Sequence, residues 1–147
     1  MSRDDIKLID SYLIDNDLNT LMLDSSCIVS THRAEGFGYL MAYALLLRKP
    51  LISTSYSGFR IPKCFPKYYP VEYQLVPTPN GKFYHDSLNQ QWAQPSHASL
   101  RNQLRACMIE ALNAKKIVAE EKFYEKFEEY YSSSAYRERL TNALILN

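Results

Sequence analysis

The sequence contains few of the residues that build metal centres or disulfide frameworks. Its 147 residues include three cysteines, three histidines, four glycines and one tryptophan. The cysteines, Cys27, Cys64 and Cys107, are odd in number and far apart, without the paired spacing of a zinc site. We therefore expect buried, reduced thiols and no metal site.

The chain also lacks an excess of charge of one sign and a long apolar run. Seventeen Lys and Arg against sixteen Asp and Glu leave a net charge of +1, so no long-range field favours nucleic acid or anionic lipid. The longest apolar stretch, residues 39–47, is too short to span a membrane, and residues 1–5 lack the order of a signal peptide. We expect a cytoplasmic protein with no transmembrane segment.

What the chain does contain is an alternation of short apolar segments with helix-like segments. This pattern predicts a single α/β domain with a doubly wound parallel sheet. The expected strands are short and lie at residues 6–13, 27–30, 51–54 and 71–76. Residues 38–48 are apolar on nearly every side and predict a helix, which Pro50 ends. Asn80 and Gly81 form a turn signal that predicts a hairpin between Val76 and Phe83.

Further helices are predicted from caps and apolar stripes. Asn16 is the expected N-cap of a first helix, and Ser96 is the expected N-cap of a later one. The first helix has its apolar face at Leu18, Leu21 and Met22, and the later one at Leu100, Leu104, Met108 and Leu112. Two more helices are expected at residues 115–129 and 136–144.

Residues 32–38, with the sequence His-Arg-Ala-Glu-Gly-Phe-Gly, connect a predicted strand to a predicted helix. Glycines on both sides of Phe37 allow main-chain N–H groups to approach a ligand closely, and the following helix directs its positive end to the same place. This arrangement suits a phosphate or diphosphate. Taken alone, a glycine pair before a helix more often serves only a tight turn.

Several other motifs follow this turn in a fixed order. They comprise Glu35 to Tyr39 with Ala42 and Ala44, residues 49–54, Tyr56 to Gly58, residues 71–79, residues 91–95 and residues 131–140. In this order they resemble the nucleotide-sugar donor domain of retaining GT-B glycosyltransferases of the group 1 (family 4) type, from about residue 6 to the C-terminus. The resemblance implies an incomplete Rossmann-like sheet, half of a GT-B fold, followed by C-terminal helices. Residues 1–147 would be one donor-domain-like unit without the acceptor domain and the first strands of the donor domain.

The resemblance also implies retaining transfer of a sugar from a nucleotide-diphosphate sugar, with no metal or other cofactor. Glu35 matches the first glutamate of a Glu-x7-Glu motif, which contacts hydroxyls of the donor sugar. The residues matching those that contact the sugar and diphosphate are Gly36, Phe37, Gly38 and Tyr39. The second glutamate, which binds the ribose, is replaced by Tyr43, whose phenol cannot supply two carboxylate oxygens.

Two neighbouring segments complete the predicted site. His32 is expected to face the sugar as a catalytic group with Glu35, and Arg33 is expected to bind a phosphate. The alternative is a loop histidine satisfied by hydrogen bonds and a surface arginine. Tyr56, Ser57 and Gly58 are expected beside the donor pocket by resemblance, and the single tryptophan, Trp92, is expected to anchor the domain core.

The sequence leaves three functions open. The first is a glycosyltransferase subunit that is completed by a homo-oligomer or by a separate chain with the acceptor domain. The second is a catalytically inactive relative that acts as a binding or scaffold module, and the third is a nucleotide or sugar-phosphate binder without turnover. Tyr43 favours the second function, whereas the intact turn from Glu35 to Gly38 favours the first or third.

Overall fold

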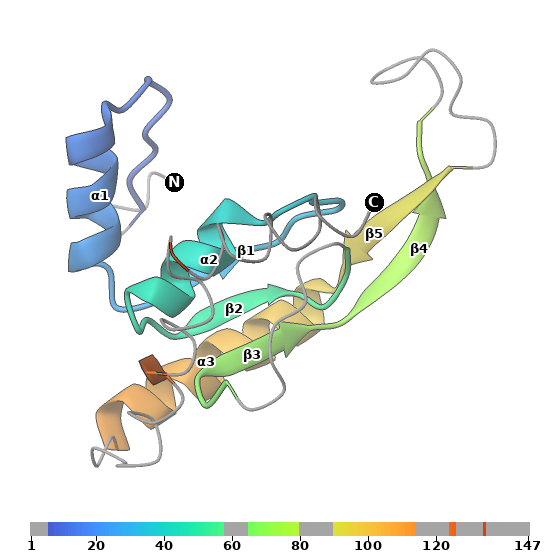
Figure 1. Cartoon of the computed structure of the whole chain (residues 1–147). Helices are drawn as coiled ribbons and strands as arrows, with labels where there is room; N and C mark the ends of the chain where they lie inside the picture. The colour runs from blue at the N-terminus through green and yellow to red at the C-terminus, as the bar shows by residue number, and fades with distance from the viewer. Residues whose placement is uncertain (1–5, 58–64, 80–89, 114–123, 126–133, 135–147) are drawn as a thin grey trace.

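A three-stranded parallel sheet forms the centre of the fold (Figure 1). The computed structural model describes residues 6–57, 65–79, 90–113, 124–125 and 134. Within them, β1 (Ile28–Ser30), β2 (Leu51–Thr54) and β3 (Tyr68–Val71) pair in the order β1-β2-β3, and both pairs are parallel. The predicted α/β class is therefore confirmed, as are the strands expected at residues 27–30 and 51–54. The sheet is compatible with half of a Rossmann-like fold.

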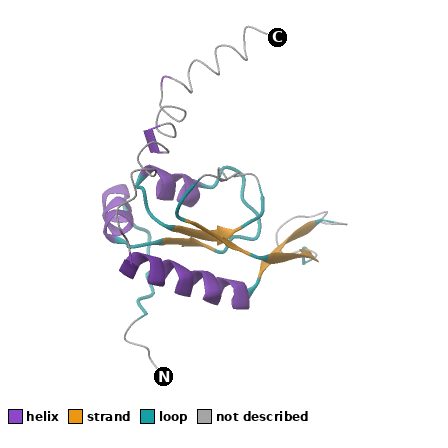
Figure 2. Ribbon diagram, turned by 90° about the horizontal axis from the view of Figure 1, so that it is seen from below, coloured by secondary structure: helices purple, strands orange, loops and turns teal. Residues whose placement is uncertain are grey.

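Helices cover both faces of the sheet (Figure 2). On one face, α2 (Tyr39–Leu46) packs against β1 and β2, and on the other face α3 (His97–Asn113) packs against β2 and β3. All four residues of β2 are buried because this central strand has a helix on each side. The helix predicted at residues 38–48 is thus confirmed as α2.

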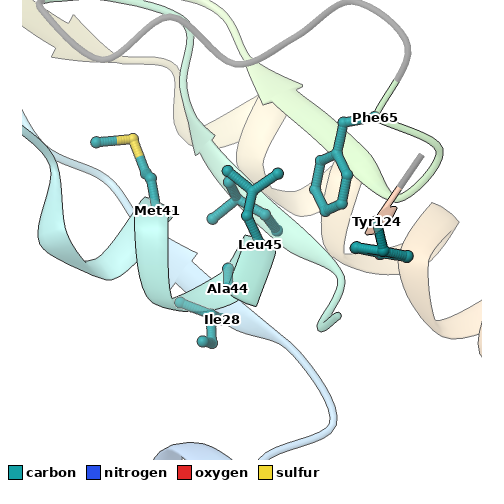
Figure 3. Packing of buried hydrophobic residues seen from close by; sticks show 7 residues of the cluster. Ile28, Met41, Ala44, Leu45, Phe65 and Tyr124 are labelled. Carbon is teal, nitrogen blue, oxygen red and sulfur yellow. The ribbon is translucent and has the colours of Figure 1, made fainter. Parts of the chain in front are cut away.

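Two hydrophobic clusters hold these layers together. In the first, Met41, Ala44 and Leu45 of α2 pack against Ile28 and Leu51 of the sheet. Figure 3 shows Phe65 and Tyr124 on the side of Leu45 away from Met41, where they close the same cluster. The second cluster lies under α3 and consists of Ile52, Tyr69, Val71 and Cys107.

A two-stranded antiparallel ribbon leaves the sheet after β3 (Figure 1). It consists of β4 (Tyr73–Pro77) and β5 (Gln91–Pro95), and Tyr73 pairs with Pro95. Pro70 is tolerated within β3 because this strand pairs only with β2 among the described residues, so one side of it needs no donor. The hairpin turn predicted at Asn80 and Gly81, with Phe83, lies outside the described residues.

The N-terminal segment corrects two predictions. Residues 6–14 form neither strand nor helix, so the strand predicted at residues 6–13 is wrong. Side chains there, such as Leu8 and Tyr12, are more than four-fifths exposed, and the segment pairs with no strand among the described residues. The predicted first helix is present as α1 (Asp15–Asp24), but its N-cap is Ile14, and Asn16 lies within the first turn.

The N-cap predicted for α3 is confirmed, but most of its predicted apolar face is wrong. Ser96 accepts the Ser99 N–H at its Oγ (3.2 Å) and the Leu100 N–H at its carbonyl (2.9 Å). Of the stripe predicted at Leu100, Leu104, Met108 and Leu112, Leu100 packs against the second cluster, but the other three are exposed and Cys107 faces the sheet instead.

The remaining helix predictions, at residues 115–129 and 136–144, lie almost wholly outside the described residues. Over the part of the chain that the structure describes, no helix is both long enough and apolar enough to cross a bilayer.

Adjacent leucines of α2 provide a matched test of the first cluster. Leu45 is fully buried, whereas Leu46 is 47% exposed. We expect Leu45→Ala to lower the free energy of unfolding by about 2–5 kcal/mol, because it leaves a cavity between α2 and the sheet. Leu46→Ala removes the same atoms from solvent-exposed surface and is expected to cost less than ~1 kcal/mol. Urea denaturation measures both, and equal losses would contradict the packing.

Candidate functional site

The carboxyl ends of β1 and β2 meet at one edge of the sheet, because the two strands are parallel and in register from Ile28↔Leu51 to Ser30↔Ser53. The chain after β1 forms residues 32–38, which we call the glycine turn, and then enters α2. The chain after β2 continues into Tyr56 and Ser57. In open α/β sheets, ligands bind beyond the carboxyl ends of the strands, at a point where the strand order reverses. The described order β1-β2-β3 has no such reversal, so the predicted residues share the carboxyl edge alone.

His32 joins the two connections. Its Nδ1 lies 3.0 Å from Ser30 Oγ and its Nε2 lies 2.9 Å from the Tyr56 carbonyl oxygen. A carbonyl only accepts, so the proton of the neutral ring is assigned to Nε2, and Nδ1 accepts from the Ser30 hydroxyl. Nε2 therefore links the two connections and Nδ1 fixes the ring at the end of β1, as in the alternative of a satisfied loop histidine. The catalytic role of His32 stays a prediction.

Ser57 forms a second link between the same loops. The Glu35 N–H donates to Ser57 Oγ at 2.7 Å, and the Ser57 hydroxyl donates to the Glu35 carbonyl. Ser57 has a φ of 89°, which is unfavourable for a residue with a side chain. Its two hydrogen bonds to Glu35 offset this strain. Gly58, also predicted here, lies outside the described residues.

In the glycine turn, one main-chain amide is hydrogen-bonded to a side chain, and the turn then enters the N-terminus of α2. The Gly36 N–H donates to the Glu35 carboxylate, with 3.1 Å between N and Oε1. A Cβ added at Gly36 would meet no atom within 4 Å, so the main chain is open to approach there. Gly38 is the N-cap of α2 in the left-handed conformation (φ 78°, ψ 59°), and no side chain of the described residues caps the helix. The first-turn amides of a helix without such a cap favour an anion.

Aromatic rings flank this helix end. The rings of Phe37 and Tyr39 lie 5.0 Å apart, and their side chains are 53% and 70% exposed. Tyr43 lies one turn further along α2 and is also exposed. On the other connection, the Tyr56 ring lies 5.0 Å from that of Tyr73. The exposed rings of Phe37, Tyr39 and Tyr43 offer flat apolar surfaces to a sugar or a base, whereas Tyr56 and Tyr73 are half-buried.

Arg33 is directed toward strand β5. Its guanidinium lies over the Trp92 ring, 4.6 Å from the centroid, and its carbonyl accepts the Ala93 N–H at 2.9 Å. The ribbon is thus attached to the glycine turn by a main-chain hydrogen bond and a cation–π contact. Trp92 is only half-buried and packs on Arg33. The binding of a phosphate by Arg33 stays a prediction.

Sequence reasoning did not assign the hydroxyls at the ends of the strands. Ser30 orients His32, and the buried Ser53 Oγ and Thr54 Oγ1 have no hydrogen-bond partner among the described residues. Buried hydroxyls are normally paired, so the partners of these two come from residues outside the described ranges, from water or from a ligand. The sequence pattern that could have identified these hydroxyls is the change from apolar to polar residues at the ends of the two predicted strands.

The rest of the described chain adds no metal ligands. No group of three or more His, Cys, Asp and Glu side chains that could hold a metal ion occurs in the described ranges. Comparisons with protein-family models, with curated proteins and with solved structures find no match to this chain.

The two glycines of the turn differ in a testable way. Gly38→Ala forces a side chain into the left-handed region, so we expect a loss of about 1–2 kcal/mol in the free energy of unfolding. Gly36→Ala meets no neighbouring atom and is expected to change that free energy by less than ~0.5 kcal/mol. Urea denaturation of both variants tests the geometry, which would be refuted if Gly36→Ala were the more damaging change.

Proposed function

We propose that the chain is a glycosyltransferase-like protein whose glycine turn binds the diphosphate of a nucleotide-diphosphate sugar at the N-terminus of α2. The observation that carries this proposal is the uncapped helix beginning at Gly38, located at the carboxyl edge of a parallel sheet. The amides of its first turn and the helix dipole both favour negative charge. Open main chain at Gly36 and the orphaned hydroxyl of Ser53 give further support.

Glu35 has two roles in this proposal. Without a ligand its carboxylate accepts the Gly36 N–H and so takes the place of an external anion. A bound diphosphate repels the carboxylate and replaces it at the amide. The released carboxylate then contacts hydroxyls of the donor sugar, as the resemblance implies. The amides and the helix dipole stabilise the charge that develops on the departing diphosphate, with no metal or other cofactor.

Transfer requires an acceptor site, which we propose is supplied by a second copy or by a separate chain. Apolar surface is available for such an association. Val29 on the edge strand β1 is 43% exposed, and α2 exposes Tyr39, Leu40, Tyr43 and Leu46 along its outer side. Surfaces of this kind are typical of protein–protein contacts. The cytoplasmic location expected from the sequence stays a prediction.

The second candidate function is an inactive relative that serves as a binding or scaffold module. Tyr43 favours it, because a phenol replaces the carboxylate that would bind the ribose. The hydrogen bonds of His32 favour it as well, because both ring nitrogens are already engaged, by Ser30 and by the Tyr56 carbonyl.

Calorimetry with Glu35→Gln tests the proposed site, because this change removes the charge and keeps the shape. We expect free nucleoside diphosphates to bind about three- to tenfold more tightly, since the competing anion is gone, and nucleotide-diphosphate sugars to bind more weakly by a similar factor. The panel should include uridine, guanosine and adenosine compounds. Asp17→Asn on α1 is the control, because it removes one charge apart from the turn (Figure 1).

Opposite shifts for the two ligand classes in Glu35→Gln alone would support the donor site. Tyr43→Glu is the companion variant, and tighter binding of nucleotides would support an otherwise competent ribose site. No measurable binding of any nucleotide by the parent chain and by Tyr43→Glu would refute the proposal and leave the scaffold function.

A further inference from the structure

Helix α3 has an exposed side that is both apolar and basic. Its members recur at intervals of three and four residues, so they share one face of the helix, which we call the α3 face. They are Arg101, Leu104, Arg105, Met108 and Leu112. The three apolar side chains are between 38% and 85% exposed, and both arginines are exposed. Cys107 packs on the sheet, and the α3 face is turned away from it.

Helix α1 has an exposed side of the opposite charge. Its members, which we call the α1 face, recur at the same intervals and are Ile14, Leu18, Leu21 and Asp24. The three apolar side chains are between 38% and 59% exposed, and Asp24 is exposed as well. The helix is attached to the rest of its chain near its end, where Met22 is buried and Lys49 Nζ donates to the Leu23 carbonyl (2.7 Å). Figure 1 shows α1 apart from α3 of the same chain.

The two faces match when the helices are antiparallel. Asp24 then lies opposite Arg101, Leu21 lies opposite Leu104, and the remaining apolar positions follow in step. Both faces span about 15–17 Å at ~1.5 Å per residue, so they cover each other along their whole length. A parallel arrangement would instead place Ile14 opposite Arg101. The charges therefore select the antiparallel direction.

The charges at the ends of the two faces are unfavourable for their own helices. Asp24 lies in the last turn of α1, at the negative end of the helix dipole, and that turn contains no basic residue. Arg101 directly follows the first turn of α3, at the positive end, and that turn contains no acidic residue. Antiparallel packing brings each of these charges to the helix end that favours it. A second helix thus compensates what each helix lacks alone.

We propose that α1 of one copy of this chain packs antiparallel on α3 of a second copy, and that the exchange is reciprocal and closes a symmetric dimer. A second copy is the fitting partner because it supplies both the acidic face and the basic face. A one-way contact would continue into open chains, whereas the reciprocal one covers all four faces. The contact involves neither the glycine turn nor α2, so the inference is independent of the proposed function.

Sedimentation velocity of the full chain, from low to high micromolar concentration, measures the association. We expect a reversible equilibrium between monomer and dimer. A monomer throughout the series, or assembly that continues beyond the dimer, would overturn the proposal.

Charge reversal tests the pairing of Asp24 with Arg101. Arg101→Glu and Asp24→Lys each place like charges together at both contacts of the dimer, so we expect each to raise the dimer dissociation constant about tenfold. Each change favours its own helix end, and circular dichroism checks that both variants stay folded. Combining the two exchanges the charges, and we expect a dissociation constant within about threefold of the parent. Additive weakening in the combined variant would overturn the pairing.

Two leucines of equal exposure test where the dimer forms. Leu21 on the α1 face is 48% exposed, and Leu46 on α2 is 47% exposed. We expect Leu21→Ser to raise the dimer dissociation constant at least about tenfold, because the dimer buries this side chain twice, and Leu46→Ser to raise it less than about twofold. An equal or larger effect of Leu46→Ser would assign the contact to α2 and overturn the proposal.

Discussion

The parallel pairing of β1 with β2 is the constraint on which the rest of the structure depends. The register from Ile28↔Leu51 to Ser30↔Ser53 makes both strands end at one edge of the sheet. Two connections far apart in the chain are therefore neighbours, and His32 bridges them through its hydrogen bonds to Ser30 and Tyr56. A shift of one residue would turn the buried side of β1 to solvent and separate these partners.

The glycine turn is held in place by its own hydrogen bonds and leads directly into the N-terminus of α2. Ser57 satisfies the N–H and carbonyl of Glu35, and the Glu35 carboxylate satisfies the Gly36 N–H. These contacts hold the loop in place without a ligand. Among the described residues no side chain caps α2 at Gly38, so this turn leads to a positive helix end. In the proposed function, a diphosphate displaces the Glu35 side chain from a preformed loop.

Local signals predicted the elements that position the site, and they failed where tertiary contacts decide. Buried β-branched residues, Pro50 and the cap at Ser96 located β1, β2, α2 and α3 correctly. The predicted strand at residues 6–13 failed because an apolar pattern does not supply a neighbouring strand. The bridge made by His32 depends on sheet register, which no local pattern encodes.

The most direct test of the account is an NMR titration of the ¹⁵N-labelled chain with inorganic pyrophosphate. The central claim is that the main chain at the start of α2 binds an anionic diphosphate. The account predicts the largest saturable shifts at the amides of Gly36, Phe37, Gly38 and Tyr39. An absence of saturable shifts up to millimolar pyrophosphate, or shifts confined to residues away from the carboxyl ends of β1 and β2, would contradict it.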